Sequence, residues 1–116
     1  EKVIRFIKRR HLEKREIITT DFFSVARKVK SICPDLKVEL GGFKKRIKAE
    51  KIIRTAKNAK ADLISPYHSI ITEKLVQEAH KSGLFIDAWE VNQKKDIVKM
   101  KRMGVDVITT DYPDRL

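Results

Sequence analysis

The stretch DLISPYHSIITEKLVQEAHKSGLFIDAWEV, residues 62–91, decides the fold because it places one helix between two apolar strands. Residues 62–65 and 84–91 are short apolar runs of the kind found in buried strands. Strands that are joined through a helix run parallel, and the helix packs on one face of their sheet. The stretch therefore predicts one strand, helix, strand unit of an α/β protein.

The helix in this unit has a start signal and a stop signal in the sequence. Thr72 is placed to cap its first turn, with Ile71 and Val76 spaced as a hydrophobic staple. Gly83 stands where a residue in the left-handed conformation ends many helices. These signals predict a helix over residues 73–82.

The same alternation continues in both directions along the chain. Apolar residues recur at helical spacing in some segments and as short runs rich in β-branched residues in others. The predicted helices are 2–14, 22–33, 45–60 and a last one from an N-cap at Asn92 to a stop at Gly104, and the other predicted strands are 16–20, 36–40 and 105–110. Five strands thus alternate with helices.

Two α/β architectures fit five such strands: a doubly wound sheet and part of a TIM-type (β/α)8 barrel. A doubly wound domain normally opens with a strand at its centre, whereas this chain begins at Glu1 with a helix. Five units in 116 residues also suit the later part of a barrel of about 250 residues. We therefore expect residues 1–116 to form a single domain, a partial barrel of about five parallel strands.

Charge and composition indicate which class of partner the chain binds and in which cellular compartment it is found. The formal net charge is +11, with +12 on residues 1–60 and −1 on residues 61–116, which favours anionic partners. Cys33 is the only cysteine, and no apolar run approaches the ~20 residues of a membrane span, so we expect a soluble cytoplasmic protein. Few amides among many charged residues resemble the composition of heat-adapted proteins.

Chemistry in a barrel is carried by the loops that follow the strands, and two of these loops carry a family resemblance. The segment from Ala61 to Pro113, with Trp89-Glu90-Val91-Asn92 and Thr110-Asp111-Tyr112-Pro113, resembles the C-terminal part of glycerophosphodiester phosphodiesterases. The resemblance implies a barrel hydrolase of lipid metabolism that cleaves glycerophosphodiesters with a divalent metal, Mg²⁺ or Ca²⁺.

In that family the tryptophan of the Trp-Thr-Val-Asn segment helps to wall the substrate pocket, which makes Trp89 and Asn92 candidate substrate-binding residues here. Core filling is the alternative for Trp89, and capping a helix is the simpler role for Asn92. His68 is a third candidate because it follows a predicted strand.

The family's catalytic motifs are His-Arg-Gly, Glu-x-Asp and His-Asp, and none of them occurs in this sequence. We therefore predict no catalytic residue and no metal ligand in this chain, which would supply the substrate-wall half of the enzyme and be inactive alone. The missing N-terminal barrel half, or a second copy of the chain, is the expected protein partner.

The sequence also predicts the surroundings of several charged residues near the strand ends. Asp87 shares the face of Trp89 and would need a buried partner, for which a lysine is the expected choice. Glu90, which replaces the family's threonine, adds a carboxylate near the pocket mouth or, if the alternation of the strand holds, points away from Trp89 toward a lysine on a covering helix. The segment 41–46, GGFKKR, is read as a solvated basic loop rather than an anion site. The overall charge predicts a positive pocket.

The alternative function is a basic, non-enzymatic module that binds nucleic acid or an anionic membrane through residues 1–60. The sequence has no recognisable nucleic-acid motif and no series of aromatic residues within its basic segments. We therefore do not expect nucleic acid as a partner and place this alternative second.

Overall fold

The computed structural model describes all of residues 1–116, and its elements follow the predicted alternation. The helices are α1 (Lys2–Arg9), α2 (Phe23–Ile32), α3 (Ala49–Ala59), α4 (Glu73–Lys81) and α5 (Lys94–Met103). The strands are β1 (Ile17–Thr20), β2 (Lys37–Phe43), β3 (Leu63–Pro66), β4 (Phe85–Ala88) and β5 (Val107–Ile108). Two 3₁₀ turns, η1 (His68–Ile70) and η2 (Pro113–Arg115), follow β3 and β5.

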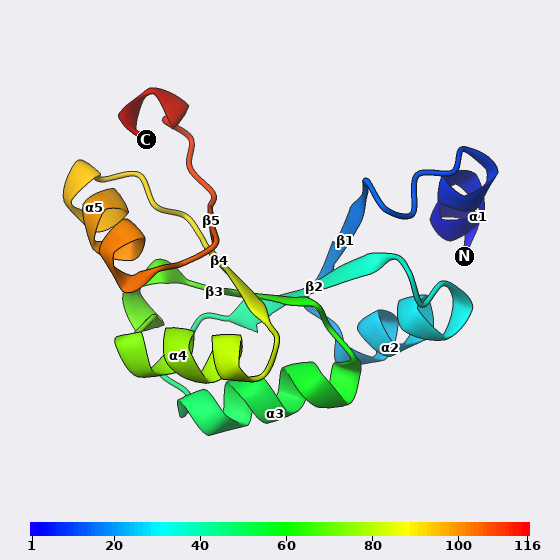
Figure 1. The fold of residues 1–116 in the computed structure, drawn as a ribbon, viewed down its shortest axis with the longest axis horizontal. Coiled ribbons are helices and arrows are strands. Elements are labelled where there is room, and N and C mark those ends of the chain that lie inside the picture. Colours follow the sequence, from blue (N-terminus) through cyan, green and yellow to red (C-terminus); the bar gives the residue numbers. More distant parts are fainter.

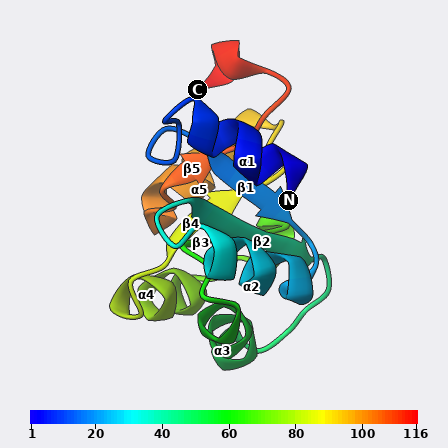
Figure 2. The ribbon, with the colours of Figure 1, turned by 90° about the vertical axis from the view of Figure 1, so that its right-hand side faces the viewer.

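The order of the strands decides between the two architectures. The five strands form one sheet in the order β1-β2-β3-β4-β5, and every neighbouring pair is parallel. A doubly wound sheet changes direction at its centre, whereas a barrel adds each strand beside the one before it. Figure 1 shows the sheet curving into a U with α2, α3 and α4 on its convex side, and Figure 2 shows α3 and α4 packed beneath it. The chain is thus part of a (β/α)8-type barrel.

The core lies between the convex face of the sheet and these helices. It is one cluster of 24 buried apolar residues, in which strands and helices both take part. Leu40, Ile64 and Ile86 from three successive strands and Ile52 and Leu75 from two helices are at most 2% exposed. Burying side chains of this size stabilises a fold by roughly 1.5–3 kcal/mol each, so this layer holds the strands, and with them the loops at their ends, in place.

Most predicted boundaries agree with the structure. The Thr72 side chain accepts a hydrogen bond from the Leu75 N–H at 3.1 Å, as expected of an N-cap. Gly83 and Gly104 have φ values of 73° and 81° just past α4 and α5, which confirms both as left-handed stop residues. Asn92 is not the N-cap of α5: that position belongs to Gln93, and it has no side-chain cap hydrogen bond.

Several boundaries differ from the prediction by two residues or more. Strand β4 ends at Ala88 rather than at residue 91, and β5 covers only 107–108 of the predicted 105–110. Helix α1 ends at Arg9 rather than at residue 14, and α3 begins at Ala49 rather than at residue 45. Strand β2 continues past residue 40 through two glycines to Phe43. Residues 44–48, which follow it, are exposed and so gain little by joining a helix.

Two aspartates that immediately precede strands tie neighbouring strands together. Asp62 accepts a hydrogen bond from the Val38 N–H at 2.9 Å and forms an ion pair with Lys30 at 2.7 Å. Asp106 accepts from the Ile86 N–H at 2.8 Å and from His80 at 2.9 Å. Each carboxylate thereby satisfies an amide near the start of the preceding strand, where no ladder partner is available.

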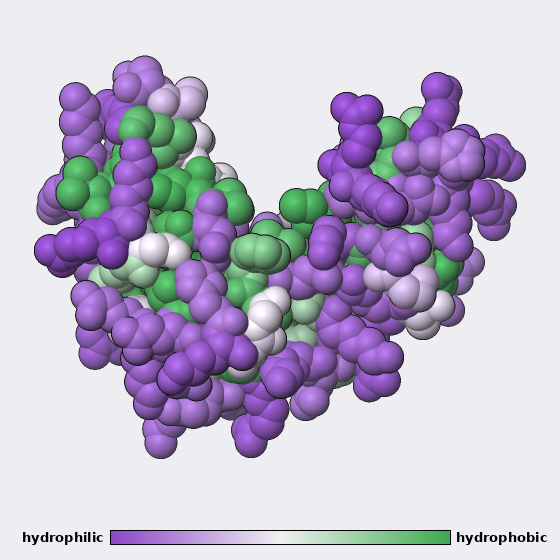
Figure 3. Space-filling view, in the orientation of Figure 1, coloured by the Kyte–Doolittle hydropathy of each residue, from purple (hydrophilic) through white to green (hydrophobic).

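The concave side of the sheet is open. Figure 3 shows a hollow between two arms, with a mainly hydrophilic outer surface and apolar patches on the inner walls. Strands β1 and β5 are the edges of the sheet, since each has a neighbour on one side only. None of the helices has the length and apolar character that crossing a membrane requires.

Candidate active site

A pocket of about 410 Å³ lies where the five parallel strands end. Every strand contributes to its lining, either directly or through the residues just beyond its end. The lining residues are Thr19 and Asp21 from β1, Glu39 and Gly41 from β2, Ser65 from β3, Asp87, Trp89 and Glu90 from β4, and Thr109 from β5. This is the end of the sheet at which barrel enzymes carry their chemistry. A larger groove, of about 720 Å³, lies between the starts of α3 and α4 and is a separate feature.

Trp89 forms a wall of this pocket and is held from several sides. Its indole N–H donates a hydrogen bond to the Ser65 carbonyl oxygen at 2.9 Å. The Tyr67 ring meets it edge-on with centroids 5.7 Å apart, and the Lys44 ammonium lies 5.4 Å from its ring centroid. The side chain is half-buried. Trp89 is therefore a fixed, partly accessible surface rather than a core filler.

The other two sequence candidates lie beside Trp89 rather than in the pocket lining. The His68 backbone N–H donates to the Trp89 carbonyl oxygen at 2.9 Å, and the His68 ring lies against Tyr67 with centroids 4.7 Å apart. The Asn92 side chain accepts from the Thr110 hydroxyl and the Asp111 N–H and donates to the Asp111 carboxylate, each at 3.0 Å. Asn92 thus joins the loops that follow β4 and β5.

Two buried carboxylates form the deep part of the pocket. Glu39 is 8% exposed and Asp87 7%, and neither makes an ion pair. Burial raises the pKa of Glu39, the Asp87 charge raises it further, and the hydroxyls of Ser65 and Thr19 partly offset the rise. Burial also raises the pKa of Asp87, against hydrogen bonds from Thr109. Both shifts reflect the cost of a charge that no cation balances.

The expected partner of Asp87 was a lysine, and this expectation is wrong within the chain. The Thr109 hydroxyl lies 3.0 and 2.9 Å from the two carboxylate oxygens of Asp87. Glu90 is exposed and lines the pocket together with Trp89, which agrees with a carboxylate near the pocket mouth; the alternative, a lysine partner, is wrong, because no lysine is paired with it. Strand β4 ends at Ala88, so the alternation of faces does not extend to Glu90.

Glu39 was missed by the sequence analysis. The signal was present, because a glutamate inside the apolar run LKVEL must either be buried or interrupt the strand. Alternation then places Glu39 on the same face as Gly41, two residues on, where the strand approaches its end. A Cβ on Gly41 would collide with the Asp21 carboxylate, so the glycine makes room for a fourth acidic side chain.

The charge of the pocket wall contradicts the expectation of a positive pocket. Four of the nine lining residues are acidic and none is basic, although the whole chain carries +11. The basic residues of 41–46 lie outside the pocket lining, and residues 44–46 are exposed, as expected of a solvated loop. The structure therefore places the positive charge around the pocket and not in it.

The acidic residues do not converge as a metal site would. No group of three or more histidine, cysteine, aspartate or glutamate side chains in the chain could hold a metal ion. Mg²⁺ and Ca²⁺ both require several oxygen ligands at close range. What the chain does build is a wall: one aromatic face, several hydroxyl groups and carboxylates that accept hydrogen bonds.

Comparisons with known proteins identify the family. The model of the glycerophosphoryl diester phosphodiesterase family matches residues 1–115. A glycerophosphodiester phosphodiesterase of Caldanaerobacter subterraneus is 32% identical over 116 residues, which are all of this chain and 46% of the relative. A Silicibacter pomeroyi crystal structure that carries the same family name is 30% identical with a TM-score of 0.87, covering 97% of this chain and 40% of its own.

A more distant structure shares the fold and holds a product. An Oleispira antarctica phosphodiesterase in complex with sn-glycerol-3-phosphate is 14% identical, with a TM-score of 0.73 over 85% of this chain and 39% of its own. The chain spans less than half the length of each of these proteins. The match over nearly every residue leaves one conclusion: the chain belongs to the glycerophosphoryl diester phosphodiesterase family.

Proposed function

We propose that the chain forms the C-terminal portion of a glycerophosphodiester phosphodiesterase barrel, as a single domain over residues 1–116. The enzyme would hydrolyse a glycerophosphodiester to glycerol 3-phosphate and an alcohol. The observation that carries this proposal is the pocket at the strand ends, walled by Trp89, in a chain of this family. Barrel enzymes bind their substrates at this end of the sheet.

The acidic wall suits the uncharged part of the substrate. Glycerol hydroxyl groups donate hydrogen bonds, and the carboxylates of Glu39 and Asp87 accept them. The Trp89 ring offers an apolar face to the carbon atoms of the glycerol. An anionic phosphate would be repelled by the same carboxylates, so its charge is met by groups beyond this wall.

His68 and Asn92 support the wall in this proposal. His68 holds the Trp89 backbone through its N–H, and Asn92 fixes the loop that follows β5 through Thr110 and Asp111. In this proposal Trp89 contacts the substrate, and His68 and Asn92 stabilise the loops next to it.

The chemical step is proposed to depend on residues outside this chain. A divalent cation such as Mg²⁺ or Ca²⁺ would act as a Lewis acid on the phosphoryl group. Its ligands and the general acid and base are assigned to an N-terminal barrel half, because the acidic side chains of this chain do not converge on a metal site. The open edges at β1 and β5 are where the strands of that half would pair, and a second copy of this chain is the alternative occupant.

The proposed compartment is the cytoplasm. The lone cysteine, Cys33, is buried and free, so the fold does not depend on an oxidising environment. Nucleic acid is not proposed as a partner.

The experiment is an assay of metal-dependent release of glycerol 3-phosphate by the complete barrel, in which this chain is joined to the proposed N-terminal half, and by two variants of that protein. Trp89→Ala removes the wall, and we expect kcat/KM to fall by roughly 10- to 100-fold, the effect of losing a major binding contact. Phe85→Ala removes an aromatic side chain that is 52% exposed at the opposite end of β4 and serves as the matched control.

Two outcomes would count against the proposal. Absence of metal-dependent release by the unmodified complete barrel would reject the activity. Equal activity of Trp89→Ala and Phe85→Ala would reject the role of Trp89 while leaving the activity in place.

A further inference from the structure

A short basic segment follows β2 at the same end of the sheet as the pocket. Residues Lys44, Lys45, Arg46, Ile47 and Lys48, here named the basic rim, are all exposed. Strand β2 has a neighbour from this chain on each side, β1 and β3. The rim therefore follows an interior strand of the sheet and not one of its open edges.

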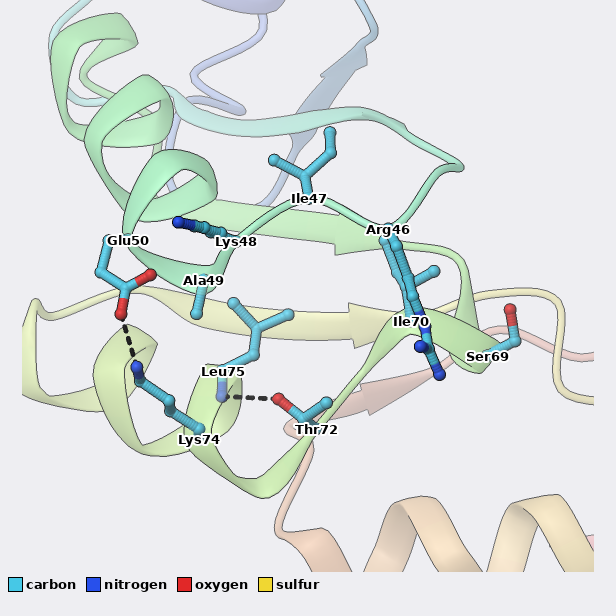
Figure 4. A pocket seen from close by; sticks show the side chains of 10 residues that line it. All are labelled: Arg46, Ile47, Lys48, Ala49, Glu50, Ser69, Ile70, Thr72, Lys74 and Leu75. Atoms are coloured by element: carbon cyan, nitrogen blue, oxygen red, sulfur yellow. Dashed lines mark hydrogen bonds and ion pairs between the residues drawn. The ribbon is translucent and has the colours of Figure 1, made fainter.

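The rim overhangs the groove of about 720 Å³ between the starts of α3 and α4. Figure 4 shows Arg46 extending along the groove toward Ser69, while Ile47 projects on the other side of the segment. Glu50 is the only acidic residue in the lining, and it is already paired with Lys74. The cationic side chains of Arg46 and Lys48 have no ion-pair partner.

The positive charge continues from the rim along the outer surface of α3. Lys51 and Arg54 join Arg46 and Lys48 in lining a second hollow of about 430 Å³, in which Glu50 is again the only acid. Four cationic side chains, none of them ion-paired, thus face one side of the molecule. Such a concentration attracts an anionic surface more strongly than scattered charges of the same number.

The rim also reaches the pocket. The ammonium of Lys44, its first residue, lies 5.4 Å from the centroid of the Trp89 ring. Exposed aromatic residues stand on other loops at the same sheet end, with Phe22 after β1 69% exposed and Tyr112 after β5 44% exposed. An object that contacts the rim therefore lies close to the mouth of the pocket.

We propose that the basic rim is a docking surface for anionic phospholipid headgroups, which places the mouth of the pocket at a bilayer surface. Charge complementarity supplies the attraction, and Ile47, which is 37% exposed among four cations, supplies an apolar side chain that can enter the interface. Surfaces that bind single-stranded nucleic acid instead use aromatic side chains on which bases stack, and the rim has none. This docking is independent of the proposed hydrolysis.

The test is co-sedimentation of the protein with vesicles of phosphatidylcholine alone or of phosphatidylcholine mixed with phosphatidylglycerol. We expect binding to the anionic vesicles only, and a decline with added salt. Each basic residue near such a surface contributes about 1 kcal/mol, so the triple variant Lys45→Gln, Arg46→Gln, Lys48→Gln should bind about 100-fold more weakly at low salt. Lys44 is left unchanged because it contacts Trp89.

A matched control removes the same charge at the opposite end of the sheet, where Lys57, Lys60 and Arg102 lie at the ends of α3 and α5. Their triple replacement by glutamine should leave vesicle binding within about threefold of the unmodified protein, because those charges lie beyond the Debye length of about 10 Å. Ile47→Ser should weaken binding severalfold at every salt concentration, because it removes the apolar contribution.

Three results would overturn the proposal. The first is equal binding to neutral and anionic vesicles, and the second is an equal loss in the control variant. The third is binding of a single-stranded RNA probe that depends on the rim without any binding to anionic vesicles, which would assign the surface to nucleic acid. Each is measured without turnover, so none depends on the outcome of the hydrolysis assay.

Discussion

The two buried carboxylates of the pocket, Glu39 and Asp87, should oppose folding at neutral pH. Each is buried without a cation, and the charge of Asp87 raises the pKa of Glu39 in addition to the effect of burial. Replacing either by its amide, as Glu39→Gln or Asp87→Asn, removes the charge and keeps the shape. We therefore expect both variants to be more stable than the unmodified protein at pH 7.

The size of the effect is set by the cost of burying a polar group without a full set of partners, about 1–3 kcal/mol in proteins. Because both carboxylates face the open pocket, screening by water reduces the expected gain to about 1 kcal/mol for each variant. In Asp87→Asn the amide oxygen can still accept the hydrogen bond from Thr109. The double variant should gain about 0.5 kcal/mol less than the sum of the single gains, because either substitution already relieves the repulsion.

The pH dependence of this effect has a definite sign. The folded protein holds its protons on Glu39 and Asp87 more tightly than the unfolded chain, whose values are near 4.5 and 3.8. Stability therefore falls as the pH rises from these values through the raised pKa values, and it is recovered as the pH falls. The gain of the amide variants should therefore be larger at neutral pH and should shrink as the pH falls toward the values of the unfolded chain.

Urea unfolding of the protein at a series of pH values measures this difference. Asp35→Asn, at an exposed aspartate, is the control and should change the free energy of unfolding by less than about 0.5 kcal/mol. A loss of stability at pH 7 in Glu39→Gln or Asp87→Asn would refute the reasoning, since it would mean that a cation balances the pair. A gain that persists unchanged at acid pH would refute it as well.

Two further substitutions test the supports of the site. Asp106→Asn weakens the acceptor for the Ile86 N–H and for His80, and we expect the free energy of unfolding in urea to fall by about 1–2 kcal/mol. An unchanged unfolding midpoint would show that these two hydrogen bonds do not contribute to stability. Gly41→Ala places a Cβ against a carboxylate oxygen of Asp21, whose exposed side chain can rotate away, so it should cost less than about 1 kcal/mol in the free energy of unfolding. A larger loss that Asp21→Ala does not relieve would place the strain elsewhere.

Local signals in the sequence predicted much of the fold. Thr72, Gly83 and Gly104 act through their own side chain or backbone, and all three lie where their chemistry requires. The start of α3 was predicted wrongly, because lysine and arginine in residues 44–48 are compatible with a helix. These residues are exposed, so no burial of apolar side chains stabilises a helix there. The order of the strands required the structure, since two architectures share the same alternation.

The candidate site was predicted in part. The position of Trp89 at a strand end, together with the family resemblance, predicted a pocket-wall residue that shares a face with Asp87. The structure has both residues in the lining of one pocket, and the substrate-binding role of Trp89 stays a prediction. The partners of these side chains come from other strands, such as Thr109 for Asp87 and Ser65 for Trp89. Pairings across 22 and 24 residues depend on strand register, which periodicity does not provide.

In the proposed enzyme, Trp89 and the strand ends form the wall against which the glycerol part of the substrate lies. A crystal structure of the protein with glycerol 3-phosphate bound is the sharpest test of this placement. We expect the glycerol carbons to be in van der Waals contact with the Trp89 ring and the glycerol hydroxyl groups to face the carboxylates of Glu39 or Asp87. A product bound with its phosphate against those carboxylates, or away from Trp89 altogether, would contradict it.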